Sequence, residues 1–353
     1  MDLDVAAAAQ WDRDGAFPRE VVKDMAAAGW LCSDVDREGG ATALELGELC
    51  ARLGAVCTAL RGLVTVQGMV AAVLSRWGTA DQRATWLPAM ASGDVVAGFA
   101  ATEAGAGTEL SAVGTVVEAD GGSLVVTGRK RWVTCGEIAD VHLVLGVLDG
   151  KPATVLVEAD RPGVLVEPVR DQLGMRAARI AHVEFDRVRV PASNLLAPAG
   201  VGLSHVVATA LDHGRFTVAW GCAGMARACL DDAVAHSRRR TQGGVRGADH
   251  QLVRAMLARA SVTTESALLL CREAALTRGE VGSTARTVIA KYAAATAAAS
   301  VSRDAVQILG SAGCDPSSRV GRFFRDAKVM QVIEDSDEVC ELHIADHLLR
   351  SAG

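Results

Sequence analysis

The sequence predicts an α+β protein with a helical N-terminal domain, a middle antiparallel β-domain and a C-terminal four-helix bundle. Three observations predict this order. Residues up to 94 have helical texture, short apolar runs separated by turn residues follow up to residue 200, and long alanine-rich helical segments fill the rest. The 353 residues also exceed one compact core, since a domain usually holds about 100–200 residues. We expect domains at 1–94, 95–200 and 201–353.

The N-terminal part contains four predicted helices. The first covers residues 18–29, beginning with Pro18 and ending at Gly29. Proline just inside the start of a helix and glycine just past its end are common boundaries, because each residue suits the backbone there. The other helices are predicted at 42–59, 61–77 and 82–92.

Short strands alternate with turns between residues 95 and 200. Strand-like runs lie at 95–100, 115–118, 124–127, 141–148, 153–157, 164–169 and 182–190. Asp120-Gly121-Gly122 separates two of these runs and has the residue types that a tight hairpin turn needs. Short strands at this spacing predict an antiparallel β-domain.

The C-terminal part consists of long helical segments with short connections. They are predicted at 202–240, 249–278, 283–309 and 320–350, with turns rich in glycine or containing proline between them. Long helices joined by short loops pack against their neighbours, so we expect a four-helix bundle.

The composition excludes several classes of protein. A net charge of −6, one tyrosine and six phenylalanines argue against a nucleic-acid-binding surface. The nine cysteines include no CxxC pair, which argues against a disulfide framework and a cysteine zinc site and favours a reduced, cytoplasmic protein. The acidic N-terminus is unlike a signal peptide, and no apolar run reaches the ~18–20 residues of a membrane span.

A glycine-rich segment leaves the first predicted strand at residues 101–109. Gly105 and Gly107 allow the backbone to approach a ligand closely, and Thr102 and Thr108 supply hydroxyl groups. A dinucleotide-binding GxGxxG motif does not fit, because Leu110 occupies the third glycine position and the context is antiparallel. Taken alone, the segment could equally be a simple glycine turn.

A second segment, residues 128–134, contains Trp132 and Thr134. Trp132 could be a core residue, as most buried tryptophans are. Alternatively, its indole forms a flat wall for a cofactor ring, with the Thr134 hydroxyl donating a hydrogen bond to a ring nitrogen. The segment by itself does not decide between the two.

The third segment, residues 322–338, contains the candidate catalytic base. Glu334 follows the apolar residues Val329, Met330, Val332 and Ile333. Removal from water disfavours the charged carboxylate and raises its pKa toward the range useful for a general base. The competing interpretation is a helix followed by a solvated acidic turn.

These segments, in this order, resemble the acyl-CoA dehydrogenase family from about residue 18 onward. The resemblance implies an FAD-dependent enzyme with Glu334 as catalytic base. It implies FAD contacts by Phe99, Ala101, Thr102, Gly107, Thr108, Trp132, Thr134, Arg240, Gln307, Gly310, Ser311 and Ser336, and substrate contacts by Thr108, Arg215 and Ile333. In the family, residues equivalent to Arg240 and Gln307 reach FAD across a subunit interface, so a homodimer or homotetramer is expected.

Within the family, the sequence resembles the acyl-carrier-protein dehydrogenases of hydroxymalonyl or methoxymalonyl extender-unit synthesis in polyketide pathways. The features that carry this resemblance lie at 31–33, 38–40, 219–222 and 326–334. It implies oxidation of a hydroxylated three-carbon unit on an acyl carrier protein, with oxidation at C3 as one hypothesis for the reaction. The alternative is α,β-dehydrogenation of a short-chain acyl-CoA.

Three departures from the family pattern bear on the site. Gly243 replaces a phenylalanine at the expected subunit contact, and Asp335 replaces the glycine after the base. Asp337 and Glu338 follow closely, and such crowding of carboxylates should raise their pKa values. We expect a small, polar substrate rather than a long acyl chain.

Two interpretations from other classes stay open. His343 and His347, four residues apart, could bind a metal together with Glu338 or Glu341. The fold could also persist as a scaffold or binding protein without flavin. The retained Thr102, Trp132, Thr134 and Glu334 argue against such a scaffold.

Overall fold

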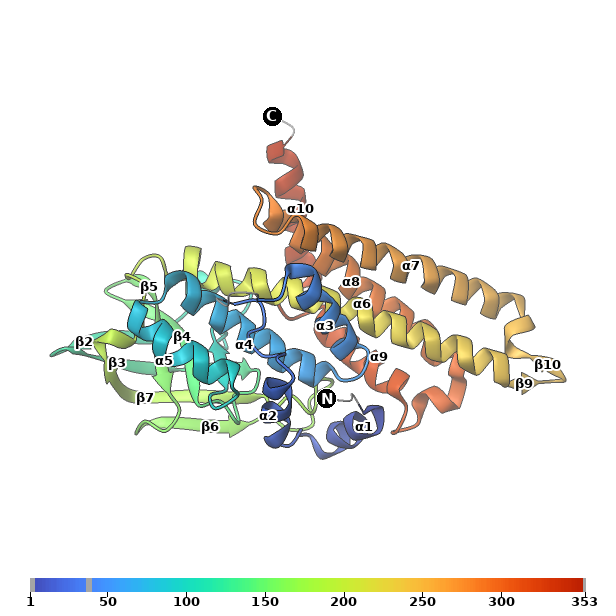
Figure 1. The fold of residues 1–353 in the computed structure, drawn as a ribbon, viewed down its shortest axis with the longest axis horizontal. Coiled ribbons are helices and arrows are strands. Elements are labelled where there is room, and N and C mark those ends of the chain that lie inside the picture. Colours follow the sequence, from blue (N-terminus) through green and yellow to red (C-terminus); the bar gives the residue numbers. More distant parts are fainter. Residues whose placement is uncertain (1–3, 36–39, 352–353) are drawn as a thin grey trace.

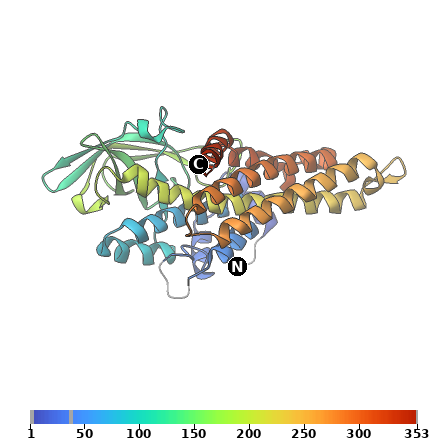
Figure 2. The same cartoon turned by 90° about the horizontal axis from the view of Figure 1, so that it is seen from above.

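The computed structural model describes residues 4–35 and 40–351. Residues 38 and 39, which are among those that resemble the acyl-carrier-protein dehydrogenases, lie outside the described residues. A sheet occupies one end of the molecule and a bundle of long helices extends to the other (Figure 1). Seen from above, the start of the longest helix lies between the sheet and two N-terminal helices (Figure 2).

Five helices form the N-terminal part. They are α1 Val5–Asp14, α2 Glu20–Ala27, α3 Ala43–Gly54, α4 Thr58–Trp77 and α5 Ala80–Ala91. Thr42 begins α3 with a capping box, in which its side chain and that of Glu45 satisfy each other's backbone N–H groups. Thr79 and Gln82 do the same for α5. The helix predicted at 42–59 ends earlier in the structure, at Gly54, and the next helix, α4, begins at Thr58.

The central helix of this domain is α4. Its residues from Thr58 to Ala71 are all buried. Contrary to the sequence expectation, α4 is long and apolar enough to cross a membrane by length and composition, the one such helix among the described residues. However, 89% of that apolar stretch is buried inside the fold. The composition of α4 is therefore that of a core helix.

The β-domain is one mixed sheet. Its strands are β1 Ala97–Ala100, β2 Val116–Asp120, β3 Ser123–Val133, β4 Val141–Leu148, β5 Lys151–Glu158, β6 Val164–Pro168, β7 Ala181–Pro191 and β8 Leu195–Leu196. The order is β6-β7-β3-β2-β4-β5-β8, and β1 also pairs with β4.

The prediction of an antiparallel domain needs one correction, since β1 and β2 both pair with β4 in parallel. Residues 97–100 pair with 141–144, and residues 116–117 pair with 147–148. The two strands thus lie end to end along the same edge of β4. The glycine-rich segment at 101–109 leaves the sheet between β1 and β2, so both strands can run in the same direction along β4.

The C-terminal part consists of α6 Ala208–Arg239, α7 Gln251–Leu276, α8 Ser283–Leu309, α9 Arg319–Met330 and α10 Asp337–Ser351. A short hairpin, β9 Thr241–Gln242 and β10 Val245–Arg246, joins α6 to α7 at the end farthest from the large sheet (Figure 1). The single helix predicted at 320–350 is wrong. Glu334 and Asp335 adopt φ angles of +50° and +72°, which an α-helix cannot contain, so α9 and α10 are separate.

His142 of β4 is buried in the β-domain, and neither ring nitrogen has a hydrogen-bond partner in the described chain. Burial lowers the pKa of His142 to about 4. The unfolded chain takes up a proton near pH 6.5, whereas the folded protein does so only near pH 4. His142 therefore lowers stability as pH falls between these values, by about 3 kcal/mol in total.

We expect His142→Leu to remove this acid sensitivity. The measurement is the free energy of unfolding of both proteins by urea denaturation from pH 7 to pH 4. The stability of the variant relative to the wild type should increase steadily as the pH is lowered. A constant difference across this range would mean that folding does not lower the pKa of His142.

Candidate active site

Glu334 lies in the turn between α9 and α10 and faces α6. Its Oε2 atom is buried and has no hydrogen-bond partner among the described residues. Gly214 of α6 makes room for this carboxylate, because a Cβ atom added at Gly214 would lie 2.4 Å from Oε2. The Met69 Sδ atom of α4 would lie 3.1 Å from that added Cβ atom. Two domains therefore enclose the carboxylate.

This enclosure gives Glu334 the properties of a general base. Burial raises the pKa of Glu334 to about 7, and the neighbouring Asp335 carboxylate also acts to raise it. The positive charges of Arg215, Arg61 and Lys291 oppose the rise. A carboxylate with this pKa is partly ionised at neutral pH and is basic enough to accept a proton from a substrate.

Asp335 holds the turn in place. Its Oδ2 atom lies 2.7 Å from Arg215 Nη2 and 3.6 Å from His343 Nδ1. Its backbone carbonyl accepts a hydrogen bond from the ammonium group of Lys291, which is fully buried in α8. A φ of +72° would suit glycine, but aspartate tolerates this conformation better than most residues. Asp335 thus keeps the backbone shape and adds an ion pair.

The acidic crowding expected from the sequence acts on two of the carboxylates. Besides raising the pKa of Glu334 through Asp335, it adds to the effect of burial, which raises the pKa of Asp337. A hydrogen bond with Ser336 instead lowers the pKa of Glu338. Glu338 is exposed, and Asp337 accepts a hydrogen bond of 2.7 Å from Gln331 Nε2. Ser336 lies near the start of α10 and its Oγ atom is 3.4 Å from the Val339 N–H group. Ile333 packs against the main hydrophobic core. The apolar surroundings predicted for Glu334 come more from α4 and α6 than from its own segment, since Val332 is exposed.

Trp132 is a surface wall and not a core residue. Its side chain is 53% exposed. The pairing of β3 with β7 is irregular between Lys130 and Val133, and Trp132 has a φ of +60° at this point. His182 supports it, since the backbone N–H of Trp132 donates to His182 Nδ1 at 3.2 Å and the two rings meet edge to face. A flat indole is therefore presented to the outside of the sheet.

Thr134 lies next to α4, two residues beyond Trp132. A Cβ atom added at Gly62 would come within 3.6 Å of the Thr134 methyl group and 3.0 Å of Met175 Cε. Thr134, two residues after Trp132, therefore lies beside α4. The same helix carries Met69, which lies near Glu334.

A buried ion pair fixes the glycine-rich segment beside Trp132. Lys130 Nζ donates to Glu103 Oε1 at 2.7 Å and to the Ala101 carbonyl at 3.0 Å. Glu103 also accepts hydrogen bonds from Thr115 Oγ1 and the Gly114 N–H. Burial acts to raise the pKa of Glu103, but the bonds from Lys130 and Thr115 bring it below its ordinary value.

The expected ligand-contacting residues of this segment lie around that ion pair. The Thr102 carbonyl accepts from the Arg131 N–H at 2.8 Å, which ties the segment to β3. Ala101 is buried and Phe99 half-buried, whereas Gly107 and Thr108 are exposed. No atom lies within 4 Å of a Cβ added at Gly105 or Gly107. Space for a ligand is therefore open at this segment.

We expect Lys130→Met to destabilise the β-domain by about 3–5 kcal/mol, the usual effect of leaving one partner of a buried ion pair alone. Glu103 would remain largely buried without its cation. Thermal unfolding and the flavin content of purified protein measure the effect. Adding Glu103→Gln to Lys130→Met should recover part of the loss. Unchanged stability of the single variant would show that the pair does not hold the segment.

The remaining predicted FAD contacts lie elsewhere. Arg240 is exposed where α6 meets the β9–β10 hairpin, at the end of the bundle opposite the sheet (Figure 1). Gln307, Gly310 and Ser311 are exposed at the C-terminal end of α8. One copy of the chain does not bring these residues to Trp132. The predicted contacts therefore form two separate groups.

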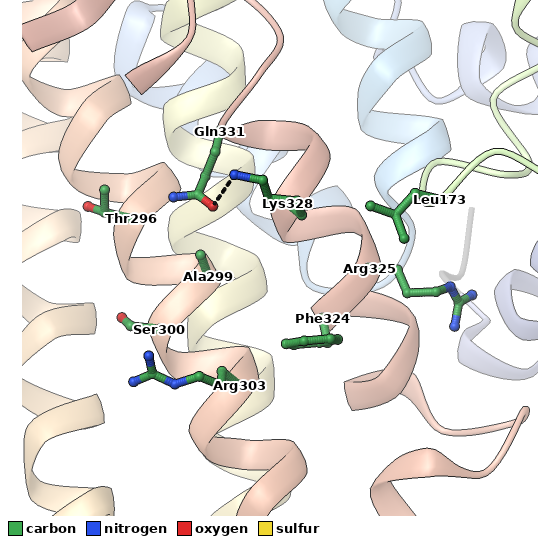
Figure 3. A pocket seen from close by; sticks show the side chains of 9 residues that line it. All are labelled: Leu173, Thr296, Ala299, Ser300, Arg303, Phe324, Arg325, Lys328 and Gln331. Atoms are coloured by element: carbon green, nitrogen blue, oxygen red, sulfur yellow. Dashed lines mark hydrogen bonds between the residues drawn. The ribbon is translucent and has the colours of Figure 1, made fainter. Parts of the chain in front are cut away.

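A cavity of about 460 Å³ lies between α8 and α9 (Figure 3). Arg303, Phe324 and Lys328 line it, and Leu173 closes it from the sheet side. Lys328 Nζ lies 3.5 Å from Gln331 Oε1, as the dashed line in Figure 3 marks. Glu334 is not among the residues that line this cavity, so the carboxylate of Glu334 and the cavity are separate sites.

The alternative metal site on α10 has no support in the described part of the chain. No group of three or more His, Cys, Asp or Glu side chains is placed to hold a metal ion there. His343 instead lies near Asp335, and Glu341 accepts a hydrogen bond from Tyr292.

Sequence reasoning missed several groups around Glu334. Arg61 and Lys291 are fully buried cations inside α4 and α8, and the Glu103–Lys130 pair was also overlooked. A signal for the first two was available, because a charged residue in the middle of an apolar or alanine-rich stretch of helix is rarely buried without a partner or a function. Gly214 gave no comparable signal.

The chain matches three consecutive domain families. They are the acyl-CoA dehydrogenase N-terminal domain over residues 3–94, the middle domain over 98–188 and the C-terminal domain over 201–349. The mitochondrial short-chain specific acyl-CoA dehydrogenase of Mus musculus is 32% identical over 363 residues, which cover 98% of this chain and 86% of that protein.

Two solved structures are similar over nearly the whole length. FkbI, which acts in biosynthesis of the methoxymalonyl extender unit of the Fk520 polyketide, has a TM-score of 0.91 and 42% identity over 97% of this chain and 96% of its own. Glutaryl-CoA dehydrogenase from Mycobacterium smegmatis has a TM-score of 0.91 and 28% identity over 96% and 89%. Fold and site together define an oxidoreductase of acyl thioesters. The chain belongs to the acyl-CoA dehydrogenase family.

The family is flavin-dependent, and the residues of this chain fit a flavin. Trp132 offers a half-exposed flat ring, and the glycine-rich segment beside it leaves open space at Gly105 and Gly107. The buried Oε2 atom of Glu334 has no partner within the described chain, as expected for a base that acts on a bound molecule. Trp132, Thr134 and Thr102 remain the residues that the sequence predicts would contact the ring system.

Proposed function

We propose that this protein is an FAD-dependent dehydrogenase that oxidises a hydroxylated three-carbon acyl group carried on an acyl carrier protein, for polyketide extender-unit synthesis. The observation that carries the proposal is Glu334, a buried carboxylate whose pKa is raised to about 7 and whose Oε2 atom has no partner in the described chain. The 42% identity to FkbI, over nearly all of both chains, supports the substrate class.

Glu334 accepts the proton that the substrate loses. In desaturation this proton comes from the carbon next to the thioester, whereas in oxidation at C3 it comes from the C3 hydroxyl. FAD supplies the acceptor for the accompanying hydride, because no protein side chain can take one. Gly214 and Met69 exclude water from the carboxylate on the side of the helices. The Glu334 backbone N–H, in the turn that the Asp335 contacts hold, would donate to the thioester oxygen.

We also propose that the enzyme works as a dimer or tetramer in the cytoplasm. Arg240 follows α6 beside the β9–β10 hairpin, which lies at the opposite end of the molecule from the sheet whose strand β3 carries Trp132 (Figure 1). Gln307, Gly310 and Ser311 lie at the C-terminal end of α8 and in the turn after it. A second copy would bring one group to the other. The nine cysteines form no disulfide, and all but Cys314 are buried, which suits a reducing compartment.

The test is product analysis by mass spectrometry with matched substrates. Purified protein is given a glyceryl or 3-hydroxypropionyl group on its acyl carrier protein, the same groups on CoA, and butyryl-CoA. We expect the carrier-protein substrates to lose two hydrogens fastest, with a carbonyl product at C3. Formation of an enoyl product from butyryl-CoA alone, with no loss of hydrogens from the hydroxylated substrates, would contradict oxidation at C3.

The second candidate is α,β-dehydrogenation of a short-chain acyl-CoA. The 32% identity to the short-chain specific enzyme of Mus musculus favours it. Faster oxidation of butyryl-CoA than of any carrier-protein substrate would establish this alternative. A colourless protein that also fails to bind added FAD would instead favour a scaffold.

A further inference from the structure

Lys291 of α8 is a buried cation that donates into the turn between α9 and α10. Its side chain is 0% exposed and lies in a stretch of helix with the buried alanines Ala290 and Ala294. Among the described residues its ammonium group donates one hydrogen bond, to the backbone carbonyl of Asp335, and makes no ion pair with a carboxylate. An ammonium group has three donors and is costly to remove from water. A lysine at this place therefore indicates a role beyond packing.

The carbonyl that Lys291 holds belongs to a turn with an unusual backbone. Glu334 and Asp335 have φ angles of +50° and +72°, and residues with a side chain adopt this conformation only where their surroundings impose it. Two helices do so here. Arg215 of α6 pairs with the Asp335 side chain at 2.7 Å, and Lys291 of α8 holds the backbone carbonyl of the same residue. Because Asp335 directly follows the base, the contact to its carbonyl constrains how Glu334 leaves the turn.

The same ammonium group acts on Glu334 through its charge. Burial raises the pKa of Glu334 to about 7, and the Asp335 carboxylate adds to the rise. Arg215 of α6, Arg61 of α4 and this lysine of α8 oppose it, so each of three helices contributes one cation. On α10, His343 lies beside Asp335, with Nδ1 3.6 Å from Oδ2. Without the lysine, Glu334 would stay protonated to a higher pH.

The cation also borders the start of α10. Burial raises the pKa of Asp337, while the hydrogen bond from Gln331 and the charge of Lys291 oppose the rise. Burial likewise raises the pKa of the Cys340 thiol to about 11, and Lys291 again opposes it. Lys291 thus lies where the turn that carries the base passes into α10.

We propose that Lys291 is a positioning residue, which through the Asp335 carbonyl holds the Glu334 carboxylate in the place where it takes up the substrate proton. The inference rests on the proposed function only in that Glu334 is the base. Lys291 also keeps this carboxylate ionised near neutral pH, so its loss has two effects on the rate. Neither effect needs a contact with the thioester. Loss of Lys291 therefore slows the chemical step and leaves thioester binding nearly unchanged.

A purely structural role for Lys291 makes different predictions. Arg322 provides a matched control, because it is also buried and also donates to a backbone carbonyl, that of Val56 at 2.8 Å. Val56 lies between α3 and α4, so this contact is outside the Glu334 turn. If Lys291 only supported packing, Lys291→Met and Arg322→Met would change the melting temperature alone and would leave the pH dependence of the reaction as it is.

The first experiment separates position from charge by anaerobic single turnover. The flavin-loaded wild type, Lys291→Met, Lys291→Arg and Arg322→Met are mixed with 3-hydroxypropionyl-carrier protein and with butyryl-CoA, and the faster reaction is followed. At about pH 9.5 Glu334 is ionised in every protein, so a remaining difference in rate reports its position. Lys291→Met should be at least about tenfold slower there, with the half-saturating thioester concentration within about twofold. Lys291→Arg keeps the charge and the donor and should recover most of the rate, and Arg322→Met should match the wild type.

The second experiment measures the effect of the charge without turnover. The free energy of unfolding of each protein is compared with that of its Glu334→Gln counterpart from pH 4 to pH 9. In the wild type the difference should stop growing near pH 7, where the folded carboxylate ionises. In Lys291→Met it should grow for about one further pH unit. If Lys291→Met does not fold, Lys291→Gln, which keeps a donor without the charge, replaces it in both experiments.

The proposal is overturned if Lys291→Met reduces the flavin as fast as the wild type at about pH 9.5, or if Arg322→Met is slowed equally. Failure of the proposed function looks different. A faster reaction with butyryl-CoA changes the substrate and leaves the effect of Lys291 in place. If the wild type reacts with neither thioester, the proposed function is wrong, and the unfolding titration decides on Lys291 alone. An unchanged titration in Lys291→Met then overturns the proposal, and a shift to higher pH supports it.

Discussion

Glu334→Gln should yield a folded, yellow protein whose turnover falls by about 10³-fold or more. General-base catalysis contributes about 10²–10⁴-fold, and glutamine cannot accept the proton. The neutral amide fits the same space against Gly214. The measurement is kcat with the best thioester substrate at pH 8, together with the flavin spectrum. Retained turnover would place the base on another residue.

The same variant should be more stable than the wild type at alkaline pH. The unfolded Glu334 loses its proton near pH 4.5, whereas the folded protein holds it until about pH 7. Stability is therefore lost as pH rises through this window, by about 3 kcal/mol in total. Glu334→Gln removes the loss, so its melting temperature should exceed that of the wild type at pH 8 and not at pH 4.

Substitution of Asp335 and Arg215 should shift the activity profile in opposite directions. In the wild type, kcat/KM should fall about tenfold per pH unit below pH 7, because the base must be ionised. Asp335→Asn removes a negative neighbour and frees Arg215, so the pKa of Glu334 should fall and the acid limb should move to lower pH. Arg215→Met removes a positive neighbour, so the limb should move to higher pH.

Both variants should also reduce kcat, because the turn loses its ion pair of 2.7 Å. Asparagine tolerates the left-handed backbone of residue 335, which limits the structural effect of that change. Lys328→Met is a suitable control, since Lys328 is exposed and its side chain donates a hydrogen bond to Gln331 and not to Glu334 or Asp335. Identical pH profiles in all of these proteins would mean that neither residue sets the pKa of Glu334.

The sequence predicted much of the fold because its signals were local. Pro18 and Gly29 bracket α2, and Asp120-Gly121-Gly122 lies at the turn between β2 and β3. The break between α9 and α10 was missed because nothing local forbids helix at Glu334 and Asp335. Their backbone shape depends on Arg215 and Lys291, which are distant in sequence.

The parallel pairing of β1 and β2 with β4 was missed for a related reason. Strand direction depends on how the segment at 101–109 leaves and re-enters the sheet, and composition does not encode that path. Trp132 shows the same limit at the site. Its role as an exposed wall depends on the irregular pairing of β3 and β7, which periodicity alone does not reveal.

An anaerobic single-turnover experiment tests the central claim most directly. The flavin-loaded wild type and Glu334→Gln are each mixed with a panel of short acyl thioesters, and the visible flavin absorbance and the product mass are followed together. The account predicts loss of flavin colour in the wild type, one substrate losing two hydrogens per flavin, and almost no change in Glu334→Gln. Equal loss of colour in both proteins, or none in the wild type with any thioester, would contradict it.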